Sequence, residues 1–163
     1  LNEFLSALSL FKKPSLNFSE KSVKLDEEGG GSSLNYFFSD PSIVTSPKTD
    51  ITMPSVDVEF TFTQDTFNQI MKASAVLGTP DVEVKGTVGG DINLVVTDRK
   101  NDTSNDFSMK VGENSSSTFS HFFKVENLKL LSGDYNVQVS NKGISHFKNI
   151  SKDVEYFIAL EAS

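Results

Sequence analysis

The side chains best suited to chemistry are few and scattered in this sequence. His121 and His146 are the only histidines, and neither belongs to a serine- or cysteine-based motif, so a catalytic triad or a zinc site has no support. Two acidic stretches, at 26–28 and 98–106, lack the spacing of an EF-hand loop. The glycines at 29–31 lack the lysine and the following helix of a phosphate-binding loop. We therefore expect no catalysis, no metal and no cofactor.

Lysines beside apolar helical patterns are the remaining candidates for binding. Lys12 and Lys13 close a first helical pattern, Lys72 lies on the polar face of a second, and Lys129 lies on that of a third. Amphipathic helices usually carry exposed lysines, whose charged ends stay in water. On the pattern alone, these four side chains belong to ordinary solvated helix faces.

Composition narrows the class of protein further. The 163 residues are 37% hydrophobic, which is enough for a core, and the formal net charge is -7 with Arg99 as the only arginine. That balance argues against a basic nucleic-acid-binding domain. The lack of cysteine excludes disulfides and thiolate catalysis, and it fits an intracellular compartment. No apolar run reaches the length of a membrane span, and no signal peptide is recognisable, so we expect no membrane partner.

The stretch 56–78 is the most clearly patterned element. Apolar and polar residues alternate from Val56 to Thr63, which predicts a strand with one buried face. Apolar residues then recur at helical spacing, with Asp65 as the expected N-cap and Gly78 as the stop. The opposite face of this helix is polar and carries Lys72.

The first third of the chain predicts a helix and a small meander. Leu1, Phe4, Leu5, Leu8 and Phe11 mark one helical face, with Lys12 and Lys13 at its C-terminal end and Pro14 as its stop. Three short alternating runs follow, with a glycine-rich turn between the last two. Prolines are spaced through 41–54, which is typical of an extended connector. We therefore divide the chain into residues 1–40, a connector at 41–54, and a domain at 55–163.

The last domain repeats the order of its elements. Strands are expected at 81–88, 91–97, 107–111 and 118–123, followed by a third helix around 125–131 and by strands at 135–140, 144–147 and 154–162. Helical patterns thus begin near positions 1, 65 and 125, so a strand-helix-strands unit returns about every 60 residues. The fold class is α+β, with antiparallel sheets and helices on one face.

Two segments carry a resemblance to a known family. Residues 37–74, from FFSDPSIVTSP to FNQIMKAS, and residues 130–163, from LLSGDYNVQVS to YFIALEAS, resemble the DNA polymerase sliding clamp of the large myophages. The opening LNEFLSALSL is similar to a helix of that clamp's N-terminal domain. The likeness runs in order along nearly the whole chain. About 60 residues, one strand-helix-strands unit, would be missing before Leu1.

The resemblance implies the DNA-clamp fold and a function. Such a protein closes as a homotrimeric ring around duplex DNA, without sequence preference, and tethers the DNA polymerase after a clamp loader has opened it. Residues 1–40 would then be the second half of a truncated N-terminal domain. Lys12, Lys13, Lys72 and Lys129 would face DNA in the pore, and Ile43, Val44 and Leu160 would receive partner peptides. The implied location is the cytoplasm of the infected bacterial host.

Two other classes of protein stay open on the residues themselves. A virion structural or assembly protein is also β-rich, acidic and free of cysteine, and it predicts no pore helices. A secreted carbohydrate-binding domain would suit the four Asn-x-Ser/Thr sequons, but it usually stacks sugars on tryptophan, which this chain lacks.

Overall fold

The computed structural model describes residues 2–43, 45, 48–113 and 115–162. Its chain forms two compact units, Leu1–Asp50 and Ile51–Ser163. The boundary at residue 50 falls within the expected connector at 41–54. The assignment of residues 1–40 to the second half of a larger domain stays a prediction.

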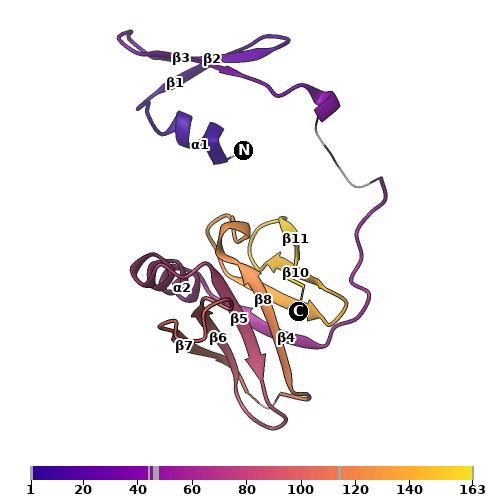
Figure 1. Cartoon of the computed structure of the whole chain (residues 1–163). Coiled ribbons are helices and arrows are strands. Elements are labelled where there is room, and N and C mark those ends of the chain that lie inside the picture. Colours follow the sequence, from indigo (N-terminus) through magenta and orange to yellow (C-terminus); the bar gives the residue numbers. More distant parts are fainter. Residues whose placement is uncertain (1, 44, 46–47, 114, 163) are drawn as a thin grey trace. The chain divides into compact units, whose positions relative to one another are not determined.

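The first unit is a helix followed by a three-stranded antiparallel sheet (Figure 1). Its elements are α1 Asn2–Leu8, β1 Pro14–Phe18, β2 Ser22–Glu27, β3 Ser33–Phe37 and the 3-10 helix η1 Pro41–Ile43. The middle strand β2 buries Val23 and Leu25 completely, and the Phe4 ring of α1 contacts the Tyr36 ring of β3 edge to face at 5.2 Å. The three strands confirm the predicted meander.

The first helix ends earlier than the sequence predicted. α1 stops at Leu8, and Pro14 begins β1 instead of ending the helix. The prediction that Lys12 and Lys13 close the helix was therefore wrong. Both residues lie in the turn before β1, where the Glu27 carboxylate accepts their backbone N–H groups at 3.0 and 2.9 Å. The backbone N–H groups of Lys12 and Lys13 therefore have acceptors outside any helix. The chain can leave the helix here and turn toward β2.

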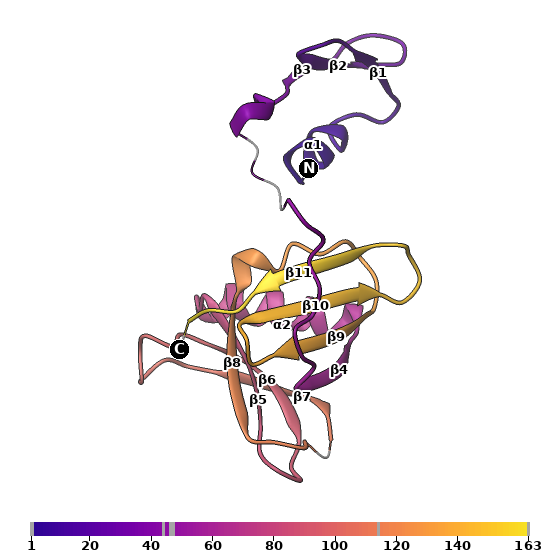
Figure 2. The same ribbon diagram turned by 90° about the vertical axis from the view of Figure 1, so that its right-hand side faces the viewer.

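The second unit contains two four-stranded antiparallel sheets. Its elements are β4 Val58–Phe62, α2 Gln64–Leu77, β5 Asp81–Gly86, β6 Ile92–Thr97, β7 Phe107–Gly112, β8 Phe119–Lys124, η2 Val125–Asn127, β9 Tyr135–Ser140, β10 Ile144–Asn149 and β11 Glu155–Ala159. The strand orders are β11-β10-β9-β4 and β7-β6-β5-β8. The helix α2 crosses behind the first of these sheets in Figure 2.

These strand orders show that the unit consists of two halves of the same plan. Each half reads strand, helical segment and three strands, from β4 to β7 and from β8 to β11. The first strand of each half pairs with the other half, β4 with β9 and β8 with β5. This exchange confirms the predicted repeat. Both halves bury their apolar faces in one core, where the rings of Phe62 and Phe123 meet that of Phe147.

The predicted bounds of α2 are confirmed except at the N-cap. The cap is Thr63 rather than Asp65, because the Thr63 hydroxyl accepts the Thr66 N–H at 3.1 Å and Asp65 falls in the first turn. Gly78 ends the helix in the left-handed region, at φ 68°, as glycine does most readily. Ile70 is fully buried under the helix, and Asn68, Gln69 and Lys72 are exposed, as expected.

The predicted third helix at 125–131 was wrong. Only the 3-10 turn η2 forms, and Leu128 leaves helical geometry at φ -82° and ψ 53°. The Val125 N–H donates to the Pro80 carbonyl at 2.9 Å, and Leu128 is buried in the core. The hydrogen bond to Pro80 and the burial of Leu128 fix the conformation of this segment. They override the weak helical preference that its apolar spacing indicates.

Candidate functional site

The exposed face of α2 is polar along most of its length, with Ala75 and Val76 exposed near its end, and it carries few charges. Lys72 is its only exposed base, and Asp65 in the first turn is its only exposed acid. Asn68 accepts a hydrogen bond from the Gln64 side chain at 3.0 Å one turn earlier. A face of amides with one ammonium group can meet a polyanion through weak, interchangeable contacts, which are sensitive to salt.

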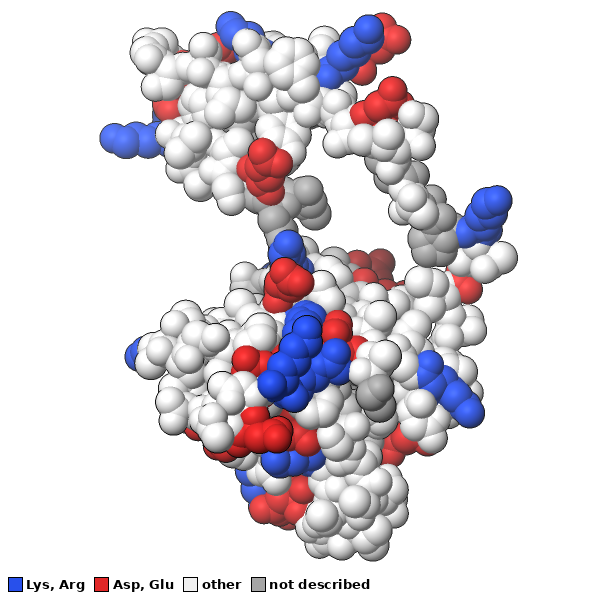
Figure 3. All heavy atoms as spheres, in the orientation of Figure 1, with Lys and Arg blue, Asp and Glu red and all other residues white. Residues whose placement is uncertain are grey.

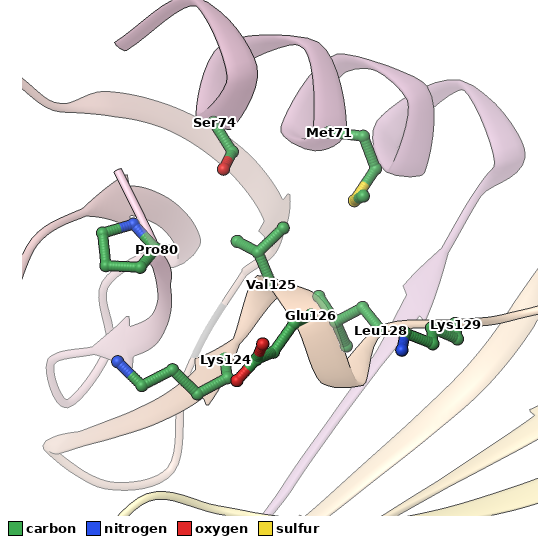
Figure 4. A pocket seen from close by; sticks show the side chains of 8 residues that line it. All are labelled: Met71, Ser74, Pro80, Lys124, Val125, Glu126, Leu128 and Lys129. Carbon is green, nitrogen blue, oxygen red and sulfur yellow. The ribbon is translucent and has the colours of Figure 1, made fainter. Parts of the chain in front are cut away.

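Two shallow pockets flank this helix. The first, of about 450 Å³, lies between α2 and the η2 segment, as Figure 4 shows. Met71 and Ser74 line it from the helix, and Val125, Leu128 and Lys129 line it from the η2 side. The second, of about 480 Å³, lies toward β7, and Lys72, Val76 and Phe107 help to line it. Lys72 and Lys129 thus border different pockets beside one helix.

The sequence pattern did not reveal these pockets. The helical spacing of the apolar residues places Met71 and Leu77 on the buried face of α2, yet each is only half-buried and lines a pocket. Val76 is 75% exposed. Val76 could have indicated a surface pocket from the sequence alone. It is an apolar residue outside the buried helical stripe, so its side chain cannot reach the core.

Lysines of the second unit differ sharply in their surroundings. Lys124 also borders the first pocket, but its ammonium group pairs with the Asp81 carboxylate, which is fully buried. Lys129 and Lys72 are exposed. Acidic and basic side chains are intermingled on the face of this unit that Figure 3 shows. That face presents no single-sign field to a polyanion.

Candidates from the first unit and the chain end are placed as follows. Lys12 and Lys13 are exposed in the turn between α1 and β1. Ile43 ends η1 and is 72% exposed, whereas Val44 lies outside the described residues. Leu160 is half-buried against the core of the second unit, and its backbone N–H donates to the Gly143 carbonyl at 2.9 Å. The exposure of Ile43 suits docking better than the packed position of Leu160.

The two histidines occupy structural positions. The His146 Nε2 atom lies 2.8 Å from the Glu155 carboxylate, and its ring stacks on Phe157 at 4.6 Å. Burial lowers the pKa of His121, whose ring stacks on Phe119. Among the described residues, no group of three or more histidine, aspartate or glutamate side chains lies close enough to hold a metal. In the same part of the chain, no helix is long and apolar enough to cross a membrane.

Arg99 holds the end of the chain against the second unit. Its guanidinium donates to the Ala162 carbonyl at 2.7 Å and to the Glu161 carboxylate at 3.2 Å, and it lies over the Phe122 ring. The Glu161 N–H also donates to the Phe122 carbonyl at 2.8 Å. The tail that follows β11 is thereby fastened to β8, in the other sheet.

Comparisons with known proteins agree with this architecture. A solved β sliding clamp of C. crescentus matches with a TM-score of 0.57 and 14% identity, over 92% of this chain and 41% of that one. An A. fulgidus PCNA, solved with the C-terminal region of FEN-1 bound, matches with a TM-score of 0.53 and 16% identity, over 92% of this chain and 64% of that one. The chain thus spans less than two thirds of either solved clamp. These likenesses show the clamp fold.

Sequence relatives are more specific. The sliding clamp of Vibrio phage KVP40 is 36% identical over 167 residues, which cover 99% of this chain and 74% of that protein. The family profile described as gp45 sliding clamp, C terminal, matches residues 59–162, nearly the whole second unit. The repeat of half-domains, the two sheets and these matches agree, and the chain belongs to the gp45 sliding clamp family.

Proposed function

We propose that this chain works as a sliding clamp, which encircles duplex DNA and tethers the replicative DNA polymerase. The observation that carries the proposal is the 36% identity to a phage sliding clamp along 99% of the chain. The proposal assigns the protein no catalysis. A virion structural role, the rival class, is not favoured, because the matching relatives and solved structures are clamps.

The mechanism is topological. A ring around DNA stays bound because leaving requires the ring to open, not because each phosphate contact is strong. The α2 face supports this idea, since it offers one ammonium group and several amides and would slow sliding little. The net charge of -7 disfavours binding of DNA to the rest of the surface.

Lys72 and Lys129 are the preferred DNA-facing residues. Both are exposed beside α2, the longest helix in the described part of the chain. Lys12 and Lys13 are retained as candidates on the turn of the first unit, where their side chains are exposed although no helix carries them. Each lysine that contacts a phosphate adds affinity that falls as salt rises.

Assembly and partners complete the proposal. The ring is a homotrimer that a clamp loader opens, and subunits join head to tail through open edge strands, because identical surfaces could not close a three-membered ring. Ile43 receives a short peptide of the polymerase, with Val44 and Leu160 as further candidates. The ring acts in the cytoplasm of the infected bacterial host.

A topological assay tests the proposal. The chain is loaded on a nicked circular plasmid with its polymerase and clamp loader, and the DNA-bound fraction is isolated by gel filtration at high salt. We expect retention on the circle and release after a restriction enzyme linearises the plasmid, because a ring slides off free ends. Equal retention on circular and linear DNA would show that the protein binds without encircling.

A further inference from the structure

The first turn of α2 is tied to a turn in the other half of the second unit. The Gln64 backbone N–H donates to the Asp134 carboxylate at 2.7 Å, and the Gly133 N–H donates to the side-chain oxygen of Gln64 at 2.6 Å. Gln64 begins the helix, whereas Gly133 and Asp134 come directly before β9. The partners are 70 and 69 residues apart in the chain. We call these two reciprocal bonds the clasp.

The clasp continues the pairing of two strands. Phe62, the last residue of β4, lies opposite Tyr135, the first residue of β9. Two residues after Phe62 the chain has turned into the helix, so the backbone ladder ends there. The side chains of Gln64 and Asp134 supply the acceptors in its place. Asp134 thereby satisfies one of the N–H groups that the start of a helix leaves without an internal partner.

The turn that carries Asp134 is itself held on both sides. The Asp134 carbonyl accepts the Ile150 N–H at 2.9 Å, and Tyr135, the next residue, is buried in the core. Gly133 has a φ of 144°, and a Cβ added there would lie 2.6 Å from the side-chain nitrogen of Asn149. Only glycine fits this turn without displacing that side chain. The clasp therefore has a firm anchor in the second half.

The exposed face of α2 starts at the clasp. Gln64 also donates from its side-chain nitrogen to Asn68 at 3.0 Å, so its amide group joins the turn to the exposed face. Lys72 follows one further turn along the same face, because residues four apart lie above one another on a helix. A change in the position of the first turn would thus also move Asn68 and Lys72.

We propose, on the basis of the clamp function proposed above, that Gln64 and Asp134 are positioning residues for the DNA-facing surface of α2. The clasp holds the helix in the pose in which Lys72 meets phosphates, and neither clasp residue needs to contact DNA. Charge alone predicts the opposite effect of losing Asp134. Removing a negative charge would strengthen the attraction of DNA, whereas losing the clasp weakens a productive contact.

Processive synthesis with the polymerase and clamp loader tests this role in three variants. Asp134→Ala removes the acceptor of the Gln64 N–H, and Asp134→Asn keeps an acceptor oxygen without the charge. Asp153→Ala removes the same charge from an exposed residue between β10 and β11. We expect shorter DNA products for Asp134→Ala alone. Equal products for the two alanine variants overturn the proposal, and so does an equal loss in Asp134→Asn, since charge would then be the cause.

Hydrogen exchange tests the clasp without DNA. In Asp134→Ala the Gln64 amide should exchange about fivefold faster, as expected for the loss of a helix cap. The same acceleration is expected at Thr66, whose N–H bonds to Thr63 and not to Asp134. The Gly78 amide, at the other end of the helix, should not change. Acceleration confined to Gln64 would show a purely local cap, and equal acceleration at Gly78 would show general destabilisation. Either result overturns the positioning role.

The two measurements separate the clasp from the clamp function. A parent chain that does not extend synthesis contradicts the clamp function, and hydrogen exchange then still decides whether the clasp holds the first turn. A parent chain that extends synthesis, together with faster exchange but full-length products in Asp134→Ala, leaves the clamp function standing and overturns the positioning role.

Discussion

The ion pair between Asp81 and Lys124 allows a test of how much a buried charge contributes to the stability of the second unit. The Asp81 side chain is fully buried, and it accepts bonds from the Lys124 ammonium group and from the Arg99 backbone N–H. Asp81→Asn keeps the shape and one acceptor oxygen but removes the negative charge. The Lys124 ammonium group is then left without its partner and without full access to water, because the Lys124 side chain is only 21% exposed.

The magnitude follows from that partial exposure. Breaking a fully buried pair costs about 3–5 kcal/mol, because an uncompensated charge remains in the interior. Lys124 can regain some hydration, so we expect a decrease near the lower limit, about 3 kcal/mol in the free energy of unfolding. With a urea dependence of about 2 kcal/mol per molar for a domain of this size, the unfolding midpoint falls by about 1.5 M.

Glu83→Gln is the matched control. Glu83 lies on the same strand, two residues from Asp81, and it pairs with Lys85. The Glu83 side chain is 14% exposed and also accepts a hydrogen bond from the Ser120 hydroxyl, for which glutamine keeps an acceptor oxygen. The Lys85 side chain is 47% exposed, so its ammonium group can return to water when the negative charge is removed. Pairs of this kind contribute about 0–1 kcal/mol, so this substitution should move the midpoint little. The double change Asp81→Asn with Lys124→Met removes both charges and should recover part of the stability.

Urea unfolding followed by far-ultraviolet circular dichroism measures all four proteins. The reasoning is refuted if Asp81→Asn costs no more than Glu83→Gln. It is also refuted if the double variant is less stable than Asp81→Asn alone, because the unpaired ammonium group would then not be the cause of the destabilisation.

Two further predictions concern DNA and pH. Lys72→Glu should reduce processive synthesis and lower the salt dependence of DNA binding, by about 0.9 in the log-log slope for each phosphate that the protein no longer neutralises, whereas Lys85→Glu on β5 should change neither. An unchanged slope would remove Lys72 from the DNA-facing set. Hydrogen bonds from the Asn141 N–H and the Ser55 hydroxyl lower the pKa of Asp57 below 3.8, so its contribution to stability is present above that pH and disappears as the pH falls through the lowered value. Acid unfolding of Asp57→Asn should therefore depend less steeply on pH below about 4, and identical profiles would contradict this assignment.

Local patterns predicted most elements of the fold. The alternation around β4, the helical stripe of α2 and its stop at Gly78 were confirmed, and β9 was predicted to the residue at 135–140. Each of these depends on neighbours within a few residues, through side-chain period or the backbone freedom of glycine. The exposure of Lys72 followed from the same period, because it lies opposite the buried Ile70.

The sequence-based predictions were wrong where contacts with residues far along the chain determine the local conformation. The apolar spacing at 125–131 is compatible with a helix, but the bond from Val125 to Pro80 and the burial of Leu128 replace it with a short turn. In the same way, the Glu27 carboxylate accepts the backbone N–H groups of Lys12 and Lys13 in the turn after α1, although it lies 15 and 14 residues further along the chain. No local propensity encodes either contact.

The amino-acid sequence by itself determined the strand-helix-strands order, the absence of cysteine chemistry and the resemblance to sliding clamps, because these depend on composition and local period. Only the tertiary structure decided that β4 and β8 exchange between the two halves and that pockets flank α2. The physical reason is that strand pairing and burial arise between residues far apart in the chain, whose meeting no local pattern specifies.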